Sequence, residues 1–159
     1  MEFNADEVRA TRERLLLRLL FRATHTMNAD MAARLRARGW EDFRSPFTGV
    51  LSHLDTEGTT VTTLAERTGT TRQAVSQLTQ TMERAGLLER VPNPHDRRSV
   101  MLRHTESGRR ILLDAIEVMT EIEHEYAGLI GAGRADELKR LLGSLVTEID
   151  PRGALHAES

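Results

Sequence analysis

Cysteine is absent from the 159 residues of this sequence, which excludes disulfides, thiolate zinc sites, iron–sulfur clusters and peroxide sensing by a thiol. Aromatic residues make up only 4% of the chain, so aliphatic side chains must supply most of the core. Apolar runs are also short, and none approaches the roughly 18 residues that a membrane span requires. The first residues are charged, unlike those of a signal peptide. These absences predict a cytoplasmic protein without membrane contact.

The net charge of −2 conceals an uneven distribution along the chain. Residues 1–59 are neutral, residues 60–110 carry a net charge of +4, and residues 111–159 carry −6. A basic segment between neutral and acidic ends favours one surface for an anionic polymer such as a nucleic acid. The length is that of about one domain, so this surface should share a core with the rest of the chain.

The two ends of the sequence are expected to form long helices. Residues 6–38 contain neither Pro nor Gly and predict one continuous helix, and residues 106–129 and 135–149 show helical spacing of apolar side chains. The run 15–21 is apolar on nearly every side, and such a helix needs burial on every side. In so small a protein, this burial requires a second copy of the chain. The expected homodimer interface includes Leu15, Leu16, Leu19, Leu20, Leu138, Leu142 and Leu145.

The middle of the sequence predicts two helices joined by a tight turn. Helical spacing covers residues 61–68, and Gly69 ends this helix. The next helix has Thr70 or Thr71 at its N-cap, and Thr70 with Gln73 three residues later fits a capping box. Two helices joined by a short turn that contains Gly form a helix-turn-helix.

A β-hairpin is expected directly after these helices. Its strands are predicted at residues 87–91 and 99–103, around a long tip that is rich in turn formers and arginine. A hairpin in this position is a wing. The fold class is therefore mainly α with a small β-hairpin wing. A winged helix-turn-helix region at 45–104 is flanked by a helical dimerisation region at 1–44 and 105–159, in one intertwined domain.

The second helix of the motif has an apolar face and a polar face. The side chains expected to point inward are Ala74, Val75, Leu78 and Met82. Amides and hydroxyls on the other face can read base edges without desolvating a charge, and Gln pairs bidentately with adenine. A solvated amphipathic helix is the plain alternative, but the adjoining glycine turn and wing favour DNA reading. The candidate DNA contacts on this helix are Thr71, Arg72, Gln73, Ser76, Gln77 and Gln80.

The segment LAERTGTTRQAVSQLTQTMERAGLLERVPNPHDRRSV, followed by TESGR, resembles the MarR (multiple antibiotic resistance regulator) family. The markers are LA-x3-G, ERAGLLER, DRR and T-x-x-G, in this order and spacing. The resemblance implies a dimer built from the terminal helices, and it implies that Asp96 positions Arg98 for the minor groove. Arg97 lies beside them in the basic tip. One residue departs from the pattern, because His104 stands where the family usually has Leu.

The resemblance also implies a partner and a mode of regulation. The expected partner is double-stranded DNA with a pseudo-palindromic operator, and the expected activity is repression that a small aromatic or phenolic molecule relieves. Phe21, His25, Phe43 and Phe47 are candidates for lining the effector pocket, with ordinary core packing as the other interpretation. No cofactor is expected beyond this unknown effector.

Two other functions stay open. A metal-responsive regulator of the same fold would need clustered ligands. A carboxylate-bridged di-iron bundle needs two Glu-x-x-His pairs, whereas Glu121 and His124 form the single pair here. A winged helix that binds proteins without binding DNA is the second alternative. An enzyme is not expected, since the sequence lacks the GxSxG, HExxH, P-loop and dinucleotide-binding patterns.

Overall fold

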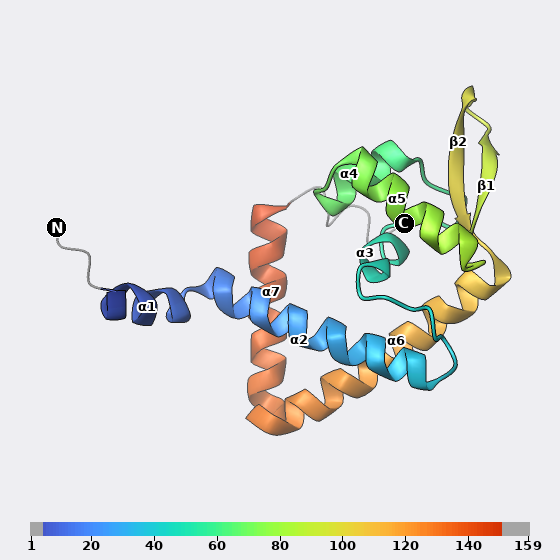
Figure 1. The fold of residues 1–159 in the computed structure, drawn as a ribbon. Coiled ribbons are helices and arrows are strands. Elements are labelled where there is room, and N and C mark those ends of the chain that lie inside the picture. Colours follow the sequence, from blue (N-terminus) through green and yellow to red (C-terminus); the bar gives the residue numbers. More distant parts are fainter. Residues whose placement is uncertain (1–4, 151–159) are drawn as a thin grey trace. The chain divides into compact units, whose positions relative to one another are not determined.

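The computed structural model describes residues 5–150, which form helices with one antiparallel hairpin between them (Figure 1). Two compact units divide the chain, Met1–Met119 and Thr120–Ser159. Within the described residues, no helix is both long and apolar enough to cross a membrane. The elements in chain order are α1 (Ala5–Arg14), α2 (Leu16–Ala37), α3 (Phe47–Leu51), α4 (Val61–Thr68), α5 (Arg72–Arg84), β1 (Leu88–Asn93), β2 (Asp96–His104), α6 (Glu106–Ile130) and α7 (Ala132–Ile149).

The core of the first unit is aliphatic, as the low aromatic content predicted. It draws side chains from each of the elements α2 to α6, because each short helix can bury one apolar face only against its neighbours. Phe43 and Phe47 meet edge to face at its centre, with ring centroids 5.7 Å apart. The largest fully buried apolar side chains are Met31, Leu35, Phe47, Val50, Leu64, Val75, Met82, Leu102, Ile111, Val118 and, in the second unit, Ile122.

The first predicted helix is interrupted at Leu15. The prediction of one helix over residues 6–38 is wrong here, because Leu15 has an extended backbone (φ −63°, ψ 131°) and occupies the N-cap position of α2. Its N–H still bonds to the carbonyl of Arg12 at 3.4 Å, which closes the last turn of α1. A run of leucines carries no stop signal, so the sequence pattern could not locate this break. The other end is as expected, because Gly39 follows α2 with φ 99°.

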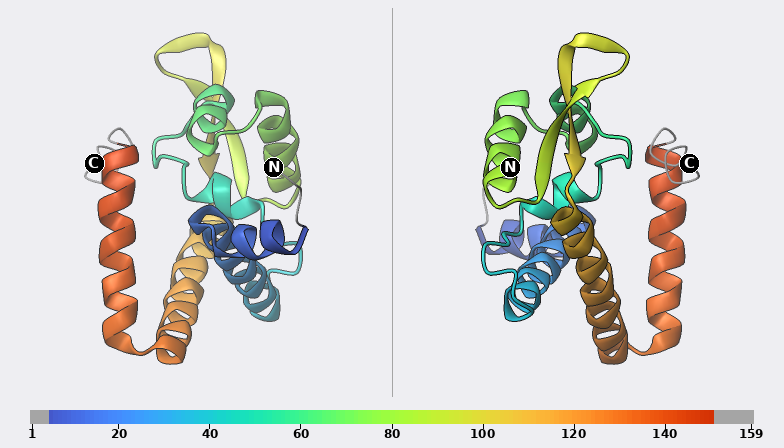
Figure 2. Two further views of the ribbon diagram at one scale, coloured as in Figure 1. Left: turned by 90° about the vertical axis from the view of Figure 1, so that its left-hand side faces the viewer. Right: turned by 90° about the vertical axis from the view of Figure 1, so that its right-hand side faces the viewer.

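The hairpin is longer than predicted and its tip is shorter. The strands continue to Asn93 and resume at Asp96, and the register shifts between Pro92 and Asn93, so that Pro92 pairs with Val100 while Asn93 pairs with Asp96. This bulge absorbs the turn-forming residues that were expected to form a long loop. Figure 2 shows the hairpin projecting beyond α4 and α5.

One residue outside the hairpin also joins it. Thr59, just before α4, exchanges both backbone hydrogen bonds with Leu102 of β2, each at 2.9 Å. Leu102 is fully buried. The base of the wing is therefore attached to the segment that leads into the helix-turn-helix.

The second unit contains the end of α6 and all of α7. Gly131 separates these helices with φ 89°, and α7 begins at Ala132, three residues before the predicted start at Ala135. Lys139 of α7 forms an ion pair of 2.7 Å with Glu123 of α6. Much of the apolar stripe of α7 is exposed in the part of the chain that the structure describes. Large exposed side chains along α7 are Leu138, Leu141, Leu145, Val146 and Ile149, whereas Leu142 is half-buried.

Candidate nucleic-acid interface

Threonine caps and a left-handed glycine set the turn between α4 and α5. The Thr60 hydroxyl accepts a hydrogen bond from the N–H of Thr63, and α4 ends at Gly69 with φ 64°, a conformation that glycine adopts without strain. Thr71 caps α5 by accepting the N–H of Ala74 at 3.1 Å. The predicted capping box of Thr70 is wrong, because Thr71 is the N-cap and the residue three positions later is Ala74.

The polar face predicted for the second helix is open to solvent on α5. Ser76 is half-buried, and the other candidates for DNA contact on this helix are exposed: Thr71, Arg72, Gln73, Gln77 and Gln80. The side chains of this face come from one helix with a side-chain N-cap, an arrangement that can present donors and acceptors to base edges.

The inward face of α5 differs from the prediction at two positions. Val75 and Met82 are buried as expected, whereas Ala74 is exposed and the expectation for it is wrong. Thr79 is fully buried instead, and its hydroxyl donates to the carbonyl of Ser76 at 3.1 Å. Thr79 lies four residues after Val75 and three before Met82, so helical spacing could have located it. Its polar side chain hid that signal.

Asp96 organises the backbone of the wing tip. Its carboxylate accepts the main-chain N–H of Arg98 at 2.9 Å, and Arg98 itself is exposed at the end of the hairpin. The amide of Asn93 donates to the Ser99 hydroxyl at 2.7 Å, and this hydroxyl donates to the carbonyl of Asp96 at 3.2 Å. Asp96 thus acts on Arg98 through the main chain. The side chain of Arg97 lies outside what the structure describes.

An ion pair joins the wing to α5. Arg90 of β1 donates to both carboxylate oxygens of Glu83, at 2.7 and 3.1 Å. Two parallel bonds fix both direction and distance, which a single ionic contact does not. Sequence reasoning missed this pair, because the two residues lie in different elements and no helical spacing links them.

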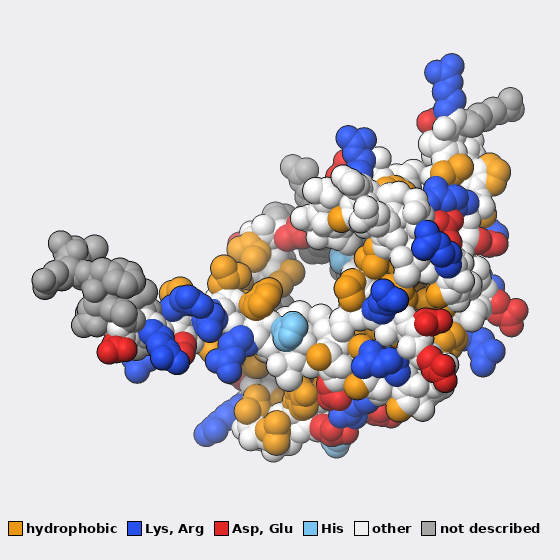
Figure 3. Space-filling view, viewed as in Figure 1, with side chains coloured by type: hydrophobic (Ala, Val, Ile, Leu, Met, Phe, Trp, Pro, Cys, Tyr) orange, Lys and Arg blue, Asp and Glu red, His pale blue; other side chains and the backbone are white. Residues whose placement is uncertain are grey.

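Ion pairs with carboxylates neutralise part of the basic segment at residues 60–110. Three arginines of the basic segment are bound to carboxylates, Arg90 to Glu83, Arg103 to Glu89 and Arg67 to Asp55. Arg72 at the start of α5 and Arg98 at the wing tip are exposed and have no carboxylate partner in the described part of the chain. A basic side chain stands at the tip of the hairpin in Figure 3. Positive charge without a carboxylate partner is therefore present at the start of α5 and at the tip of the wing.

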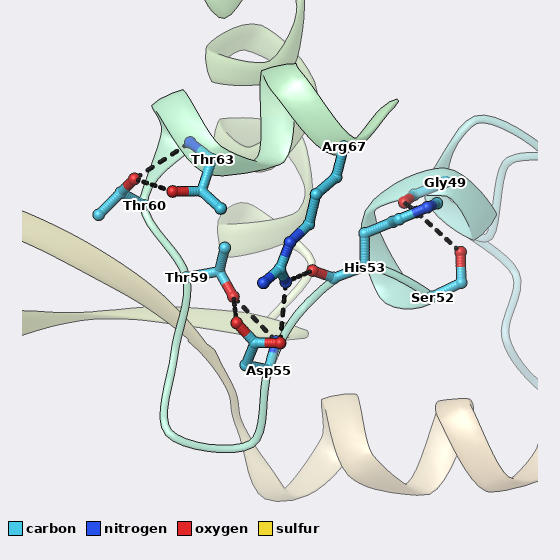
Figure 4. A network of polar contacts seen from close by, with 8 residues as sticks. All are labelled: Gly49, Ser52, His53, Asp55, Thr59, Thr60, Thr63 and Arg67. Atoms are coloured by element: carbon cyan, nitrogen blue, oxygen red, sulfur yellow. Dashed lines mark hydrogen bonds and ion pairs between the residues drawn. The ribbon is translucent and has the colours of Figure 1, made fainter. Parts of the chain in front are cut away.

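A polar network fixes α4 to the segment before it (Figure 4). The guanidinium of Arg67 donates to the Asp55 carboxylate at 2.8 Å and to the carbonyl of His53 at 2.9 Å. The Thr59 hydroxyl donates to the other Asp55 oxygen at 3.1 Å and accepts the N–H of Asp55 at 2.8 Å. Because Thr59 also pairs with Leu102, the network connects the base of the wing to α4.

His104 occupies an apolar environment at the base of the wing. The side chain is only 4% exposed, and neither ring nitrogen has a hydrogen-bond partner among the described residues. Burial lowers the pKa of the imidazole, and the positive charge of Arg109 lowers it further. The sequence departure at this position therefore places a titratable group in a site that disfavours its charged form.

Two of the four candidate effector residues are core residues. Phe43 and Phe47 are buried in the core, while Phe21 is 71% exposed and stacks on His25 along α2, with ring centroids 6.4 Å apart. The core interpretation is correct for Phe43 and Phe47, and the effector pocket stays a prediction. No group of His, Asp and Glu residues suited to a metal ion occurs among the described residues. An apolar pocket of about 380 Å³ is lined by Pro46, Gly49, Val50, Thr68, Thr70, Ala74, Val75 and Leu78.

The helix-turn-helix and most of the wing match a known protein family. Residues 48–99 match the model of the MarR family, and this range extends from α3 through α4, α5 and β1 to the tip of the wing. The helix-turn-helix and wing of this chain are therefore similar to those of the MarR family. Its members are transcriptional regulators, so the resemblance predicted from the sequence motifs is confirmed. No curated protein matches the chain.

Solved structures show the same fold over nearly the whole chain. A transcriptional repressor, CouR, bound to a 23-mer DNA duplex, is 28% identical, with a TM-score of 0.67 over 92% of this chain and 99% of that chain. CouR from Rhodococcus jostii RHA1 bound to p-coumaroyl-CoA is 24% identical, with a TM-score of 0.65 over 84% and 92% of the two chains. Apo MarR from E. coli is 20% identical, with a TM-score of 0.70 over 83% and 96%.

Proposed function

We propose that this protein is a sequence-specific repressor that binds double-stranded DNA as a homodimer and releases it when a small molecule binds. The observation that carries the proposal is the pairing of an exposed polar face on α5 with an arginine at the tip of a braced wing. The helix supplies hydrogen-bonding groups for base edges in the major groove. The wing supplies a cation for the flanking minor groove, whose negative potential attracts Arg.

The uncovered apolar side chains support a homodimer. Leu15, Leu16 and Leu19 are each at least half exposed within one chain, as are several side chains of α7. Burying the remaining exposed half of one such leucine contributes about 1 kcal/mol, so a set of them favours association. The proposed dimerisation region comprises residues 1–44 and 105–159. A two-fold dimer of this kind would place two copies of α5 in successive major grooves about 34–36 Å apart, which requires a pseudo-palindromic operator.

The proposal that a small molecule regulates this chain is based on its similarity to CouR. The similar CouR structures are those of a repressor on DNA and of the protein with p-coumaroyl-CoA, so that relative binds both a duplex and an organic ligand. For this chain we propose release by a small aromatic or phenolic molecule.

Selection from a random-sequence duplex library tests the DNA-binding proposal. Several rounds of binding and amplification with the full chain should enrich one inverted repeat, with half-sites separated by about one helical turn. The enriched duplex should bind about 10³-fold more tightly than random DNA of the same length at the same salt concentration. A library that stays random, or affinity that does not depend on sequence, would contradict the proposal and favour the protein-interaction alternative.

A further inference from the structure

The end of β2 contains a histidine that no structural role explains. His104 is buried, and both its Nδ1 and its Nε2 lack hydrogen-bond partners among the described residues. A neutral imidazole has one N–H to donate and one nitrogen to accept, and burial without partners sacrifices both interactions with water. An apolar side chain of similar size would avoid that loss.

The neighbours of His104 destabilise its protonated form relative to its neutral form. Across the ladder its partner is Leu88 of β1, which is apolar and buried. From α6, a Cβ added at Gly108 would lie 3.4 Å from Nδ1, and Arg109 donates from its guanidinium to the His104 carbonyl at 3.2 Å. The charged group facing the imidazole from these elements is thus a cation. An imidazolium here would be desolvated, would have two N–H groups without acceptors, and would lie beside a second positive charge.

The position of His104 is important because α5, the wing and α6 meet beside it. Thr105, the next residue, donates its N–H to Leu87 at 3.1 Å and its hydroxyl to Gly86 at 2.6 Å, immediately after α5. The same residue caps α6 by accepting the N–H of Gly108 at 2.9 Å. The end of α5, the base of the wing and the start of α6 are therefore held together next to the His104 ring. We call this set of contacts the wing junction, formed by residues 86–88 and 104–109.

We propose that His104 makes the wing junction acid-sensitive, so that protonation in mildly acidic solution opens the junction and lowers the affinity of the protein for its operator. The inference rests on the proposed function, because it is the proposed contact of the wing with DNA that turns a local opening into a loss of affinity. The open form hydrates the imidazolium and moves it away from Arg109, and it also releases the hairpin from α6.

The direction of the pH dependence follows from linkage. The pKa of His104 is lowered in the closed form, whereas an open or unfolded chain titrates near the ordinary value of 6.5. The closed junction therefore has its full stability above pH 6.5 and loses stability as the pH falls through 6.5 toward the folded pKa. Each chain takes up at most one proton on opening, so the opening constant rises by up to about tenfold per pH unit in this window.

Hydrogen exchange at the junction and DNA affinity, measured together, test the inference. The amide exchange of Leu102 and Thr105, corrected for intrinsic rates, is followed in the full-length protein at pH 7.5, 6.5 and 5.5 and at constant ionic strength. The affinity is measured at the same pH values with a duplex selected in vitro at pH 7.5. We expect exchange to rise and affinity to fall together in the wild type below pH 6.5. In His104→Leu, both pH dependences should become shallower.

Two further variants separate the junction from general effects of acidity. His124→Gln removes an exposed histidine of α6 and should retain the wild-type pH dependence. Arg109→Met removes the facing cation while retaining an aliphatic stem. It should raise the pKa of His104 toward 6.5 and make the pH dependence shallower, and it keeps the test available should His104→Leu not fold.

The outcomes are distinct. Equal pH dependence of exchange in wild type, His104→Leu and Arg109→Met overturns the inference. So does an imidazole that titrates at or above 6.5 by NMR in the folded protein. Junction opening with unchanged affinity also overturns it. A protein that binds no duplex at any pH contradicts the proposed function instead, and the exchange data still decide whether His104 controls the junction.

Discussion

Gly108, in the first turn of α6, lies directly against the main-chain carbonyl oxygen of Leu87, and a Cβ at position 108 would overlap that oxygen. The same carbonyl accepts the N–H of Thr105 at 3.1 Å, so it cannot move away without breaking a hydrogen bond. This contact explains the T-x-x-G spacing physically. Thr105 caps the helix through the N–H of Gly108, and only a residue without a side chain allows the capped turn to approach the wing.

We predict that Gly108→Ala destabilises the protein although alanine is the better helix former. Overpacking costs about 1–3 kcal/mol, which exceeds the gain of up to about 1 kcal/mol from helix propensity. Gly143 of α7 provides the matched control, because a Cβ there meets no atom within 4 Å. Gly143→Ala should stabilise the protein slightly. Urea unfolding of both variants measures the two signs, and an increase in stability for Gly108→Ala would contradict the close contact.

Local signals in the sequence were sufficient for the helix-turn-helix itself. The helix at residues 61–68 has the bounds that were predicted, because Thr60 and Gly69 are strong start and stop signals. The interruption at Leu15 has no such signal and was missed. The hairpin was located correctly, but its register depends on side-chain bonds such as the one from Asn93 to Ser99, which turn propensities do not encode.

For the candidate DNA-contact residues, too, the sequence predicted local features but not tertiary contacts. The periodicity of α5 predicted its exposed face, but Ala74, expected to point inward, is exposed. Thr79, for which no place was predicted, is buried, because burial follows geometry rather than polarity. The contacts that orient the face were not predictable. Glu83 and Arg90, or Asp55 and Arg67, are brought together by tertiary packing, and a single sequence contains no information on such pairs.

The polar network below α4 should contribute measurably to stability. We expect Arg67→Met to lower the free energy of unfolding by about 1–2 kcal/mol, because it removes a partly buried ion pair with Asp55 and leaves the carbonyl of His53 without its donor. Arg140→Met removes an exposed pair with Glu137 and should leave stability nearly unchanged. Chemical denaturation distinguishes the two. Equal effects for both variants would show that the network has no structural role.

A single substitution that introduces a negative charge tests the predicted dimer. Leu19→Asp places a carboxylate in the proposed interface, where desolvating it without a partner disfavours association. Sedimentation should show a dimer for the wild type and a shift toward the 17.9 kDa monomer for the variant. Val100→Asp changes an exposed apolar residue of the wing and should leave the dimer intact. A wild-type protein that is folded and monomeric at micromolar concentration would exclude the dimer.

At the wing tip, Arg98 is expected to act mainly through charge. Arg98→Ala should weaken binding to operator and random duplexes by similar factors. It should also flatten the dependence of log affinity on log salt by roughly one unit per subunit. Asp96→Ala should reproduce part of this loss, because Asp96 fixes the backbone of Arg98 through the bond of 2.9 Å. Affinities at two salt concentrations test both variants. A loss confined to the operator would instead make Arg98 a reader of bases.

On α5, Gln73 and Gln77 are exposed amides on the helix face that we propose enters the major groove, and neither carries a charge that attracts phosphate. Their replacement should therefore reduce discrimination rather than general affinity. We expect each alanine variant to lose about 1–3 kcal/mol of binding free energy on the selected operator and little on random duplex, with the salt slope unchanged. This pattern is the opposite of that for Arg98→Ala, so the variants control for one another. If Gln73, Gln77 and Arg98 can all be replaced without a change in operator affinity, α5 and the wing are not the DNA-reading surface.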